Sequence, residues 1–323
     1  MLKKLKPVLI VAGEPNSVFL EIYFKALKKN IFKSPLILIC CKNNLQQQMK
    51  KLKFKKDLRI IELDKIKTLR LDNKKINLIN IKCKKSSNIN QNRKFIKIYI
   101  KDSFDCAFKL IKDKFTHKFI NGPVNKKSFL DKKFLGMTEY ISGKFKKQKI
   151  GMLIYNKKLS VSPLTTHLPL KLVSKKITKK LISNQIKIIN NFFLKILKFK
   201  PRIAVTGLNP HCESILKFNE DEKIISSVIK SAIKKKINIK GPFSADTLFI
   251  NANRKKFDVI LGMYHDQVLT PLKTLYEYDA INITMGLPFL RISPDHGPNQ
   301  KMVGKNMSNP LSLINALKFL DKK

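Results

Sequence analysis

The sequence predicts an α/β protein. Short β-branched apolar runs alternate with longer segments of helical periodicity along the 323 residues, as strands and helices do in layered α/β folds. Hydrophobic residues make up 43% of the chain, which is enough for ordinary buried cores. A chain of this length can form two domains.

The first third of the chain begins with two strand–helix pairs. A strand is expected at residues 8–12, where five apolar residues follow one another, and a helix at 17–28. The pattern repeats with a strand at 36–41 and a helix at 43–51. Residues 65–93 are rich in Lys and Asn and only weakly periodic, so edge strands and surface loops are expected there.

The alternation continues through the rest of the chain. Each further strand is a short β-branched run, and each helix has apolar residues three or four positions apart. The expected strands are residues 118–121, 151–155, 159–163, 203–206, 258–263 and 280–284. The expected helices are residues 174–197, 221–235 and 310–320.

The formal net charge of +45 raises nucleic acid as a partner, because Lys and Arg contacts with phosphate dominate such affinity. The basic residues are nearly all Lys and occur in every segment. Arg, which is suited to bidentate base readout, is rare. We therefore interpret the charge as a solvated Lys surface and expect no nucleic-acid partner.

The cysteines favour a reducing cytoplasm, because they are odd in number and lack CxxC spacing. They are Cys40, Cys41, Cys83, Cys106 and Cys212. The first apolar run stops after about six residues, short of the roughly 7 to 15 of a secretory core. No stretch approaches the roughly 18 apolar residues of a membrane span. We expect a cytoplasmic protein with no membrane partner.

Two segments without Lys, residues 241–251 and 279–300, hold Gly, Pro, His and Asp instead. Loop residues of this kind at strand ends are where α/β proteins build sites. Of the five histidines, His117 lies in a Lys-rich segment and is expected to be structural. The other four lie in low-Lys turns: His167, His211, His265 and His296.

The histidine spacings, 44 residues from His167 to His211 and 54 from there to His265, exclude a short-spacing zinc finger. They leave open a catalytic metal site assembled by the fold, which uses three protein ligands and keeps one position open. A lone histidine is more often structural, but three at similar strand ends support one another. Asp246 or Asp266 could orient a ligand's second ring nitrogen.

A nicotinamide cofactor has no standard Rossmann site here, since no GxGxxG follows a predicted strand. The string DHGPNQKMVGKNMSNP, however, has the layout of the adenosine-binding loop of isocitrate and isopropylmalate dehydrogenases, HGSAPDIAGKGIANP. His296-Gly297, Gly304-Lys305 and Asn309-Pro310 match it position for position. Gly and Asn before a helix are also common turn residues.

The order of motifs along the chain resembles the 4-hydroxythreonine-4-phosphate dehydrogenase family. The motifs are NGPVNK, GMTEY, TTHLPL, PRIAVTGLNPH, GPFSADTLF, MYHDQ, INITMGLPFLR and DHG, with GEPN near the start resembling GEPAGIGP. The resemblance implies an isocitrate/isopropylmalate dehydrogenase-like fold with two α/β/α domains around a cleft. We expect a cofactor-side domain at residues 1–125 plus 282–323, and a metal and dimerisation domain at 126–281.

The resemblance also implies roles for individual residues. The metal ligands would be His167, His211 and His265. Asp246 would be the active-site aspartate, and Lys273 a second catalytic group. The substrate would meet Met137, Thr138, Lys273, Asn282 and Arg291, and the cofactor would meet Asp295, His296, Gly297 and Asn309. The implied assembly is a homodimer with its active site at the subunit interface and metal ligands from both chains.

The implied reaction is the oxidation of 4-phosphohydroxy-L-threonine by NAD, or NADP. The resulting 3-keto acid decarboxylates to 3-amino-2-oxopropyl phosphate, a step in the biosynthesis of pyridoxal phosphate, vitamin B6. A divalent zinc, cobalt or magnesium ion would activate the alcohol. Lys273 or Asp246 would accept or orient the proton.

Four departures from the family pattern bear on these expectations. Met137 and Asn125 replace histidines, residues 212–217 replace a glycine-rich run, and Asn306 replaces a loop glycine. Methionine cannot donate a useful hydrogen bond to phosphate. Two alternatives therefore stay open: a sister dehydrogenase of another phosphorylated four-carbon hydroxy acid or a dihydrodiol carboxylate, and a weakened homologue kept as a binding or structural protein.

Overall fold

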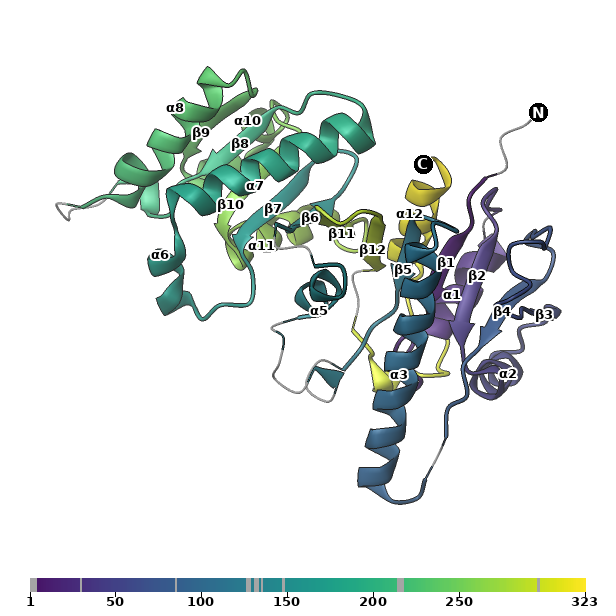
Figure 1. Ribbon diagram of the computed structural model, residues 1–323. Helices are drawn as coiled ribbons and strands as arrows, with labels where there is room; N and C mark the ends of the chain where they lie inside the picture. The colour runs from purple at the N-terminus through teal and green to yellow at the C-terminus, as the bar shows by residue number, and fades with distance from the viewer. Residues whose placement is uncertain are drawn as a thin grey trace. The chain divides into compact units, whose positions relative to one another are not determined.

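The computed structural model describes residues 5–29, 31–84, 86–125, 129–130, 134, 136–146, 149–213, 218–294 and 297–323. The chain divides into two compact units (Figure 1). Unit 1 is Met1–Met137 with Pro288–Lys323, and unit 2 is Thr138–Leu287. Each unit combines a β-sheet with helices, which confirms the α/β class. Asn282 lies in unit 2 and not on the cofactor side of the expected boundary, because its strand pairs with another strand of unit 2.

Unit 1 contains a parallel sheet in the order β3-β4-β2-β1-β5-β12. The strands are β1 (Val8–Val11), β2 (Leu36–Cys40), β3 (Leu58–Ile60), β4 (Ile76–Asn80), β5 (Lys118–Asn121) and β12 (Leu290–Pro294). The helices are α1 (Phe19–Lys29), α2 (Lys42–Lys51), α3 (Ile89–Lys112) and α12 (Leu311–Asp321). Every residue of β1, β2 and β5 is buried, as expected where helices cover both faces of a parallel sheet.

The expectation of edge strands and loops at residues 65–93 was wrong in two respects. Strand β4 lies inside the sheet between β3 and β2, and α3 already begins at Ile89. Asn88 caps this helix, its side chain accepting hydrogen bonds from the backbone of Asn90 and Gln91. The apolar face of α3 becomes regular only from Tyr99 onward, so the Lys- and Asn-rich first turns conceal the start of the helix.

Unit 2 contains a mixed sheet in the order β11-β6-β7-β10-β8-β9. The strands are β6 (Gly151–Tyr155), β7 (Ser160–Thr165), β8 (Ile203–Thr206), β9 (Ile239–Phe243), β10 (Val259–Tyr264) and β11 (Ile281–Met285). Strand β6 is antiparallel to β11 and β7, whereas β7, β10, β8 and β9 run parallel.

The helices of unit 2 follow the sequence pattern in part. They are α5 (Met137–Lys144, starting one residue before the unit), α6 (Val173–Lys176), α7 (Lys179–Phe192), α8 (Ser227–Lys234), α9 (Ala245–Leu248), α10 (Asn251–Arg254) and α11 (His265–Tyr276). The single helix expected at residues 174–197 is broken at Thr178, whose side chain accepts from Leu181 N and caps α7. A π-helical segment, Phe193–Leu197, ends it. Another, Asp221–Ser226, precedes α8.

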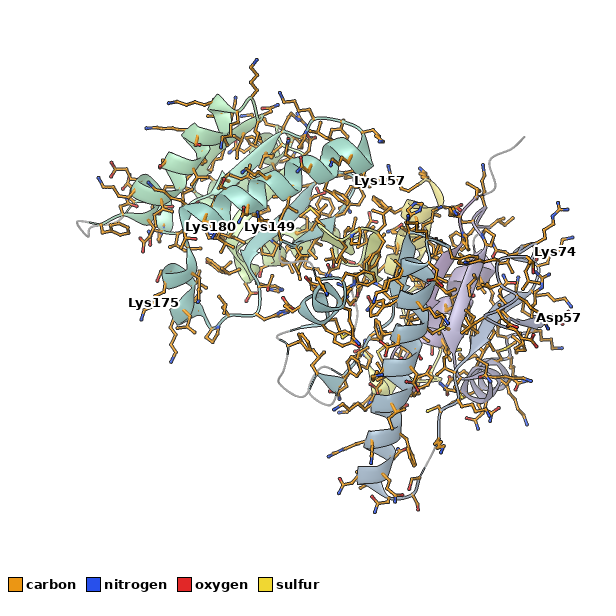
Figure 2. All side chains as sticks on the ribbon, in the orientation of Figure 1. Asp57, Lys74, Lys149, Lys157, Lys175 and Lys180 are labelled. Atoms are coloured by element: carbon orange, nitrogen blue, oxygen red, sulfur yellow. The ribbon has the colours of Figure 1, made fainter. Side chains whose placement is uncertain are left out.

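The surface carries most of the Lys side chains. Figure 2 labels Lys74, Lys157, Lys175 and Lys180 among the side chains that extend from the ribbon, and all four are exposed. All five cysteines are free thiols. No helix among the described residues has the length and apolar character needed to cross a membrane.

Candidate active site

Four predicted site residues of unit 2 follow the carboxyl ends of four neighbouring parallel strands. His265 comes directly after β10 and His167 two residues after β7. His211 lies in the loop after β8, and Asp246 lies in α9, just after β9. The carboxyl ends of parallel strands meet at one edge of a sheet, where α/β proteins bind ligands. Residues far apart in the sequence thus share one sheet edge.

His265 begins α11 with its ring oriented by the next residue. Its Nδ1 lies 2.6 Å from Oδ1 of Asp266, and the histidine side chain is 38% exposed. A carboxylate on one ring nitrogen fixes the tautomer and directs the other nitrogen outward. A hydrogen bond between one ring nitrogen and a carboxylate, as between His265 and Asp266, is common in histidines whose other nitrogen binds a metal.

The loop that carries His211 is shaped by a buried carboxylate. Asp221, 1% exposed, accepts hydrogen bonds from Leu208 N at 2.6 Å, Asn209 N at 3.1 Å and Asn209 Nδ2 at 2.9 Å. A Cβ at Gly207 would lie 2.7 Å from both Asp221 Oδ1 and Cys212 Sγ. The loop therefore requires glycine there and the carboxylate beside it.

His211 and Cys212 adopt left-handed backbone conformations, with φ of 55° and 61°. Such values are uncommon outside glycine. Burial raises the pKa of the Cys212 thiol, while a hydrogen bond with Ser244 works in the opposite direction. Ser244 and Asp246 both follow β9, so the His211 loop lies beside the segment that holds Asp246.

Gln267 ties the His211 loop to His265. Its Oε1 accepts from Thr206 Oγ1 at 2.8 Å and from Met263 N at 2.7 Å. Its Nε2 donates to Gly207 O at 2.7 Å. One amide thus joins the end of β8, the end of β10 and the first turn of α11.

The rings of the three predicted metal ligands are accessible: His167 and His211 are exposed and His265 is partly exposed. Within the described part of the chain, which includes all three, no three or more His, Cys, Asp or Glu residues are grouped closely enough to hold a metal ion. One chain therefore brings the histidines to one sheet edge without closing them around a common point.

Lys273 and Asn282 have environments suited to binding. Lys273 is partly buried on α11, and burial lowers its pKa. Asn282 lies on β11, where its Oδ1 is buried and has no hydrogen-bond partner among the described residues. An unsatisfied buried acceptor costs about 1 to 3 kcal/mol, so a donor on a ligand would be stabilising there. Asp246 is exposed and Thr138 partly buried.

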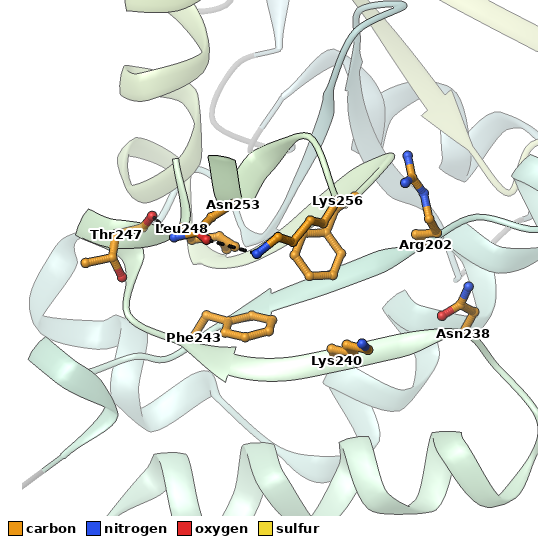
Figure 3. Close-up of a pocket in the computed structure, with 9 residues that line it drawn as sticks. Arg202, Asn238, Lys240, Phe243, Thr247, Leu248, Asn253 and Lys256 are labelled. Atoms are coloured by element: carbon orange, nitrogen blue, oxygen red, sulfur yellow. Dashed lines mark hydrogen bonds between the residues drawn. The ribbon is translucent and has the colours of Figure 1, made fainter. Parts of the chain in front are cut away.

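A cavity of about 630 Å³ lies elsewhere in unit 2 (Figure 3). Its lining includes Phe243 and Phe257, whose ring centroids are 5.5 Å apart, and Arg202, which is ion-paired with Asp258 at 2.8 Å. None of the predicted site residues lines it, although Thr247 follows Asp246 directly. Its size is typical of a ligand pocket, but it is separate from the residues singled out by sequence.

In unit 1 the GEPN and NGPVN motifs pack backbone against backbone at the ends of β1 and β5. A Cβ at Gly13 would lie 2.3 Å from Pro123 O, and one at Gly122 would lie 2.2 Å from Ala12 O. Glu14 is buried beside them, and its Oε2 accepts from Asn125 N at 3.3 Å. Burial raises the pKa of Glu14, and the Asn125 hydrogen bond opposes this.

Two predicted substrate residues lie in unit 1. Arg291 on β12 is 3% exposed, and its Nε donates to Asn121 Oδ1 at 2.8 Å, which fixes the guanidinium. Met137 is 7% exposed at the start of α5. Met137 is thus packed among other side chains, at the position where the family pattern has a histidine.

The predicted cofactor loop also lies in unit 1, although Asp295 and His296 fall outside the described residues. A Cβ at Gly297 would meet only Asn299 Oδ1, at 3.7 Å, among the described atoms. Asn306 has φ of 59°, a conformation that Asn tolerates better than most side chains. Asn309 Oδ1 accepts from the backbone N–H of Leu311, the first residue of α12, at 2.9 Å.

Sequence reasoning missed the residues that hold the site, namely Asp221, Gln267, Glu14 and Asn121. One signal for Glu14 was available: the chain has only 22 Asp and Glu, so an acid that follows an apolar run and a glycine is conspicuous, whereas Asp221 stands between two other acids and gave no such signal. Gln267 stands in the motif MYHDQ beside a predicted ligand.

Comparison with known proteins gives a consistent result. Residues 32–320 match the family model described as pyridoxal phosphate biosynthetic protein PdxA. The chain is 35% identical over 318 residues to 4-hydroxythreonine-4-phosphate dehydrogenase of Sulfurihydrogenibium sp., covering 96% of each. It also resembles the solved structure of that enzyme from Klebsiella pneumoniae, with 25% identity, a TM-score of 0.79 and 98% of each chain covered. A Burkholderia phymatum enzyme of the same name matches with 25% identity, a TM-score of 0.80 and coverage of 99% of this chain and 98% of that chain. The chain therefore belongs to the family of the pyridoxal phosphate biosynthetic protein PdxA.

Proposed function

We propose that this protein is a 4-hydroxythreonine-4-phosphate dehydrogenase that uses NAD or NADP. The substrate would be 4-phosphohydroxy-L-threonine, and the oxidised 3-keto acid would lose carbon dioxide to give 3-amino-2-oxopropyl phosphate for pyridoxal phosphate biosynthesis. The observation that carries the proposal is the placement of three histidines and Asp246 after four adjacent parallel strands in a member of the PdxA family.

The imidazoles of His167, His211 and His265 suit a divalent ion. When bound, such an ion would polarise the substrate oxygen during both oxidation and decarboxylation. Three nitrogen donors favour zinc or cobalt, because magnesium prefers an octahedral set of oxygens. The Asp266 carboxylate would keep the His265 ring in the orientation that presents its second nitrogen.

We further propose a homodimer in which each metal site takes histidines from both chains. One chain does not gather the three rings, and their exposure leaves them accessible to a second copy. Two-fold symmetry would then create two identical sites.

Side chains of this protein would accept the hydroxyl proton and bind the charged groups of the substrate. As hydride leaves carbon 3 for the nicotinamide, the hydroxyl proton must pass to a base. Lys273 suits this role because burial lowers its pKa toward the range of an effective acceptor, and Asp246 would orient the hydroxyl. Arg291 would bind an anionic group of the substrate. The buried Asn282 Oδ1 would accept a hydrogen bond from the substrate.

The function is tested by following NAD reduction with 4-phosphohydroxythreonine. We expect activity in the wild type, at least a hundredfold loss in His211→Ala, and near-normal activity in His117→Ala, which changes a histidine outside the proposed site. Chelation should abolish activity, and zinc or cobalt should restore it. Full activity after complete metal removal would contradict the proposal.

Mixing two inactive variants tests the shared site. If His167 and His211 of one site come from different chains, then a dimer of one His167→Ala chain and one His211→Ala chain keeps one intact site. Random reassociation of equal amounts should restore about a quarter of wild-type activity, since half of the dimers are mixed. No recovery would place both histidines of a site on the same chain.

Met137 supports a second candidate, a sister dehydrogenase of another phosphorylated four-carbon hydroxy acid. Its buried thioether cannot offer phosphate the donor that a histidine would. A substrate panel separates the two candidates. A preference above about tenfold, or about 1.4 kcal/mol, for a substrate that lacks the amino group would favour the sister enzyme.

A further inference from the structure

Both ends of the loop at residues 297–310 are fastened to the α1 region of unit 1. Near its start, Pro298 O accepts from Val18 N at 3.0 Å, just before α1 begins. Near its end, the segment from Asn306 to Ser308 bonds to two α1 side chains one turn apart, Glu21 and Lys25. Between these anchors the chain forms a turn of its own, with Met302 N donating to Asn299 O at 2.9 Å.

Glu21 accepts the backbone N–H groups of this segment. The side chain is 2% exposed. Its Oε1 accepts from Ser308 N at 2.8 Å and Ser308 Oγ at 2.5 Å, and its Oε2 accepts from Asn306 N at 3.1 Å. Both carboxylate oxygens are thus engaged by the loop.

Lys25 takes the backbone carbonyls of the same two residues. Its Nζ donates to Asn306 O at 2.8 Å, to Ser308 O at 2.7 Å and to Glu21 Oε1 at 3.2 Å. An ammonium has three N–H donors, and these three acceptors match them. The Glu21–Lys25 ion pair therefore accepts hydrogen bonds from the backbone N–H groups of Asn306 and Ser308 and donates hydrogen bonds to their backbone carbonyls.

The loop itself contributes little packing that could hold it in place. Lys305, Asn306, Met307 and Asn309 are exposed, and the Met307 side chain is 70% exposed. Ser308 alone in this stretch is buried, beside Glu21. The conformation of the segment thus depends on polar contacts to α1.

We infer that Glu21 and Lys25 are positioning residues for the cofactor, which fix the backbone from Asn306 to Ser308 so that the adenosine portion of NAD meets a preformed loop. Neither side chain needs to touch the cofactor. The inference rests on the proposed function, because the loop's cofactor role comes from its sequence resemblance. A preformed loop avoids the ordering cost that a mobile loop would incur on binding.

The test is the variant Glu21→Gln, with Glu62→Gln as its matched control. An amide NH2 in place of either carboxylate oxygen would face a backbone N–H donor, so one contact becomes repulsive. We expect the Kd and KM for NAD to rise at least about tenfold, while kcat at saturating NAD and the KM for the phosphorylated substrate stay within about twofold. Glu62 pairs with Lys65 on the exposed surface of the same unit, and its variant should match the wild type.

Ser308→Ala and Lys25→Arg extend the test to variants that disturb folding less. Ser308→Ala removes one hydroxyl donor and should raise the Kd for NAD about threefold, and Lys25→Arg, which keeps the charge, should fall between it and the wild type. Direct NAD binding by calorimetry supplies a readout besides turnover, and thermal unfolding checks that each variant is folded.

If folded Glu21→Gln and Ser308→Ala bind NAD as tightly as a wild type that binds NAD, this inference is wrong, but the proposed function is not affected. The same holds for an equal loss of kcat, substrate affinity and NAD affinity, which indicates a general structural role. A wild-type protein that binds neither NAD nor NADP would overturn the proposed function as well.

Discussion

The two units position their candidate site residues by different means. In unit 1 the motif loops meet backbone to backbone at Gly13 and Gly122, and the 297–310 loop is bonded through its own amides and carbonyls. In unit 2 the candidate residues after the parallel strands are exposed or partly exposed side chains, and buried Asp221 and the Gln267 amide hold the His211 loop and the ends of β8 and β10. A cofactor recognised by shape needs a fixed backbone, whereas a metal needs oriented rings.

Of the proposed substitutions, Gly122→Ala should have the largest effect on stability, because it disrupts the backbone contact in unit 1. Its Cβ would lie 2.2 Å from Ala12 O, a backbone atom that cannot rotate away. We expect a loss of about 3 kcal/mol or more in the free energy of unfolding, measured by urea denaturation. Gly297→Ala, whose Cβ has no described neighbour closer than 3.7 Å, should change it by less than about 0.5 kcal/mol. Equal losses of stability in Gly122→Ala and Gly297→Ala would show that the close backbone contact at Gly122 does not determine the effect.

Asp221→Asn tests the side-chain support in unit 2. The amide replaces an acceptor with a donor facing backbone N–H groups, so we expect a loss of about 2 to 3 kcal/mol in the free energy of unfolding. We also expect metal affinity to fall about 10- to 100-fold, measured by competition with a chromophoric chelator. Glu222→Gln, which changes an adjacent exposed acid, is the control. Normal metal affinity in a destabilised Asp221→Asn would separate Asp221 from the metal site.

Lys273, in unit 2, should make the free energy of unfolding depend on pH. Because burial lowers its pKa in the folded protein, the unfolded chain binds this proton more tightly. Stability therefore rises with pH between the lowered folded pKa and the ordinary lysine pKa of about 10.4. The stability of the wild type relative to Lys273→Met should improve as pH rises through that window, and Lys256→Met, on the exposed surface, should show no such trend. A pH-independent difference would contradict this environment for Lys273.

Asn306→Gly should have the smallest effect, because the loop is held by the backbone of this residue and not by its side chain. The left-handed conformation, with φ of 59°, suits glycine, so the free energy of unfolding should change by less than about 1 kcal/mol. The Kd for NAD should stay within about twofold of the wild type. A large loss of NAD affinity would instead assign the amide side chain a direct role in binding.

Much of the fold was predictable because several buried strands of the parallel sheets are continuous apolar runs. The runs at β1, β2 and β8 are uninterrupted and fully buried. Strand β9 contains Gly241 and Pro242 and lies at the sheet edge, so its sequence resembles a turn. Helix α11 contains Pro271 and buries only Val268 and Leu272, which leaves too weak a periodic signal to predict it.

The candidate site was predictable only where function depends on residue type. Histidines in Lys-poor turns were visible, and the family resemblance gave them an order. Supporting residues such as Gln267 and Glu21 were hidden because their partners are backbone atoms far along the chain: Gln267 bonds Gly207, 60 positions away, and Glu21 bonds Ser308, 287 positions away. Any polar residue could have such a partner, and only the fold determines which one does.

His167, His211, Asp246 and His265 each follow a different strand of one sheet, namely β7, β8, β9 and β10. A change in the segment after one strand can thus move a single candidate site residue while the other three keep their places. Substitutions after one strand are therefore expected to affect one candidate site residue at a time. The exception is Gln267, because its amide connects the ends of β8 and β10 and so couples the positions of His211 and His265.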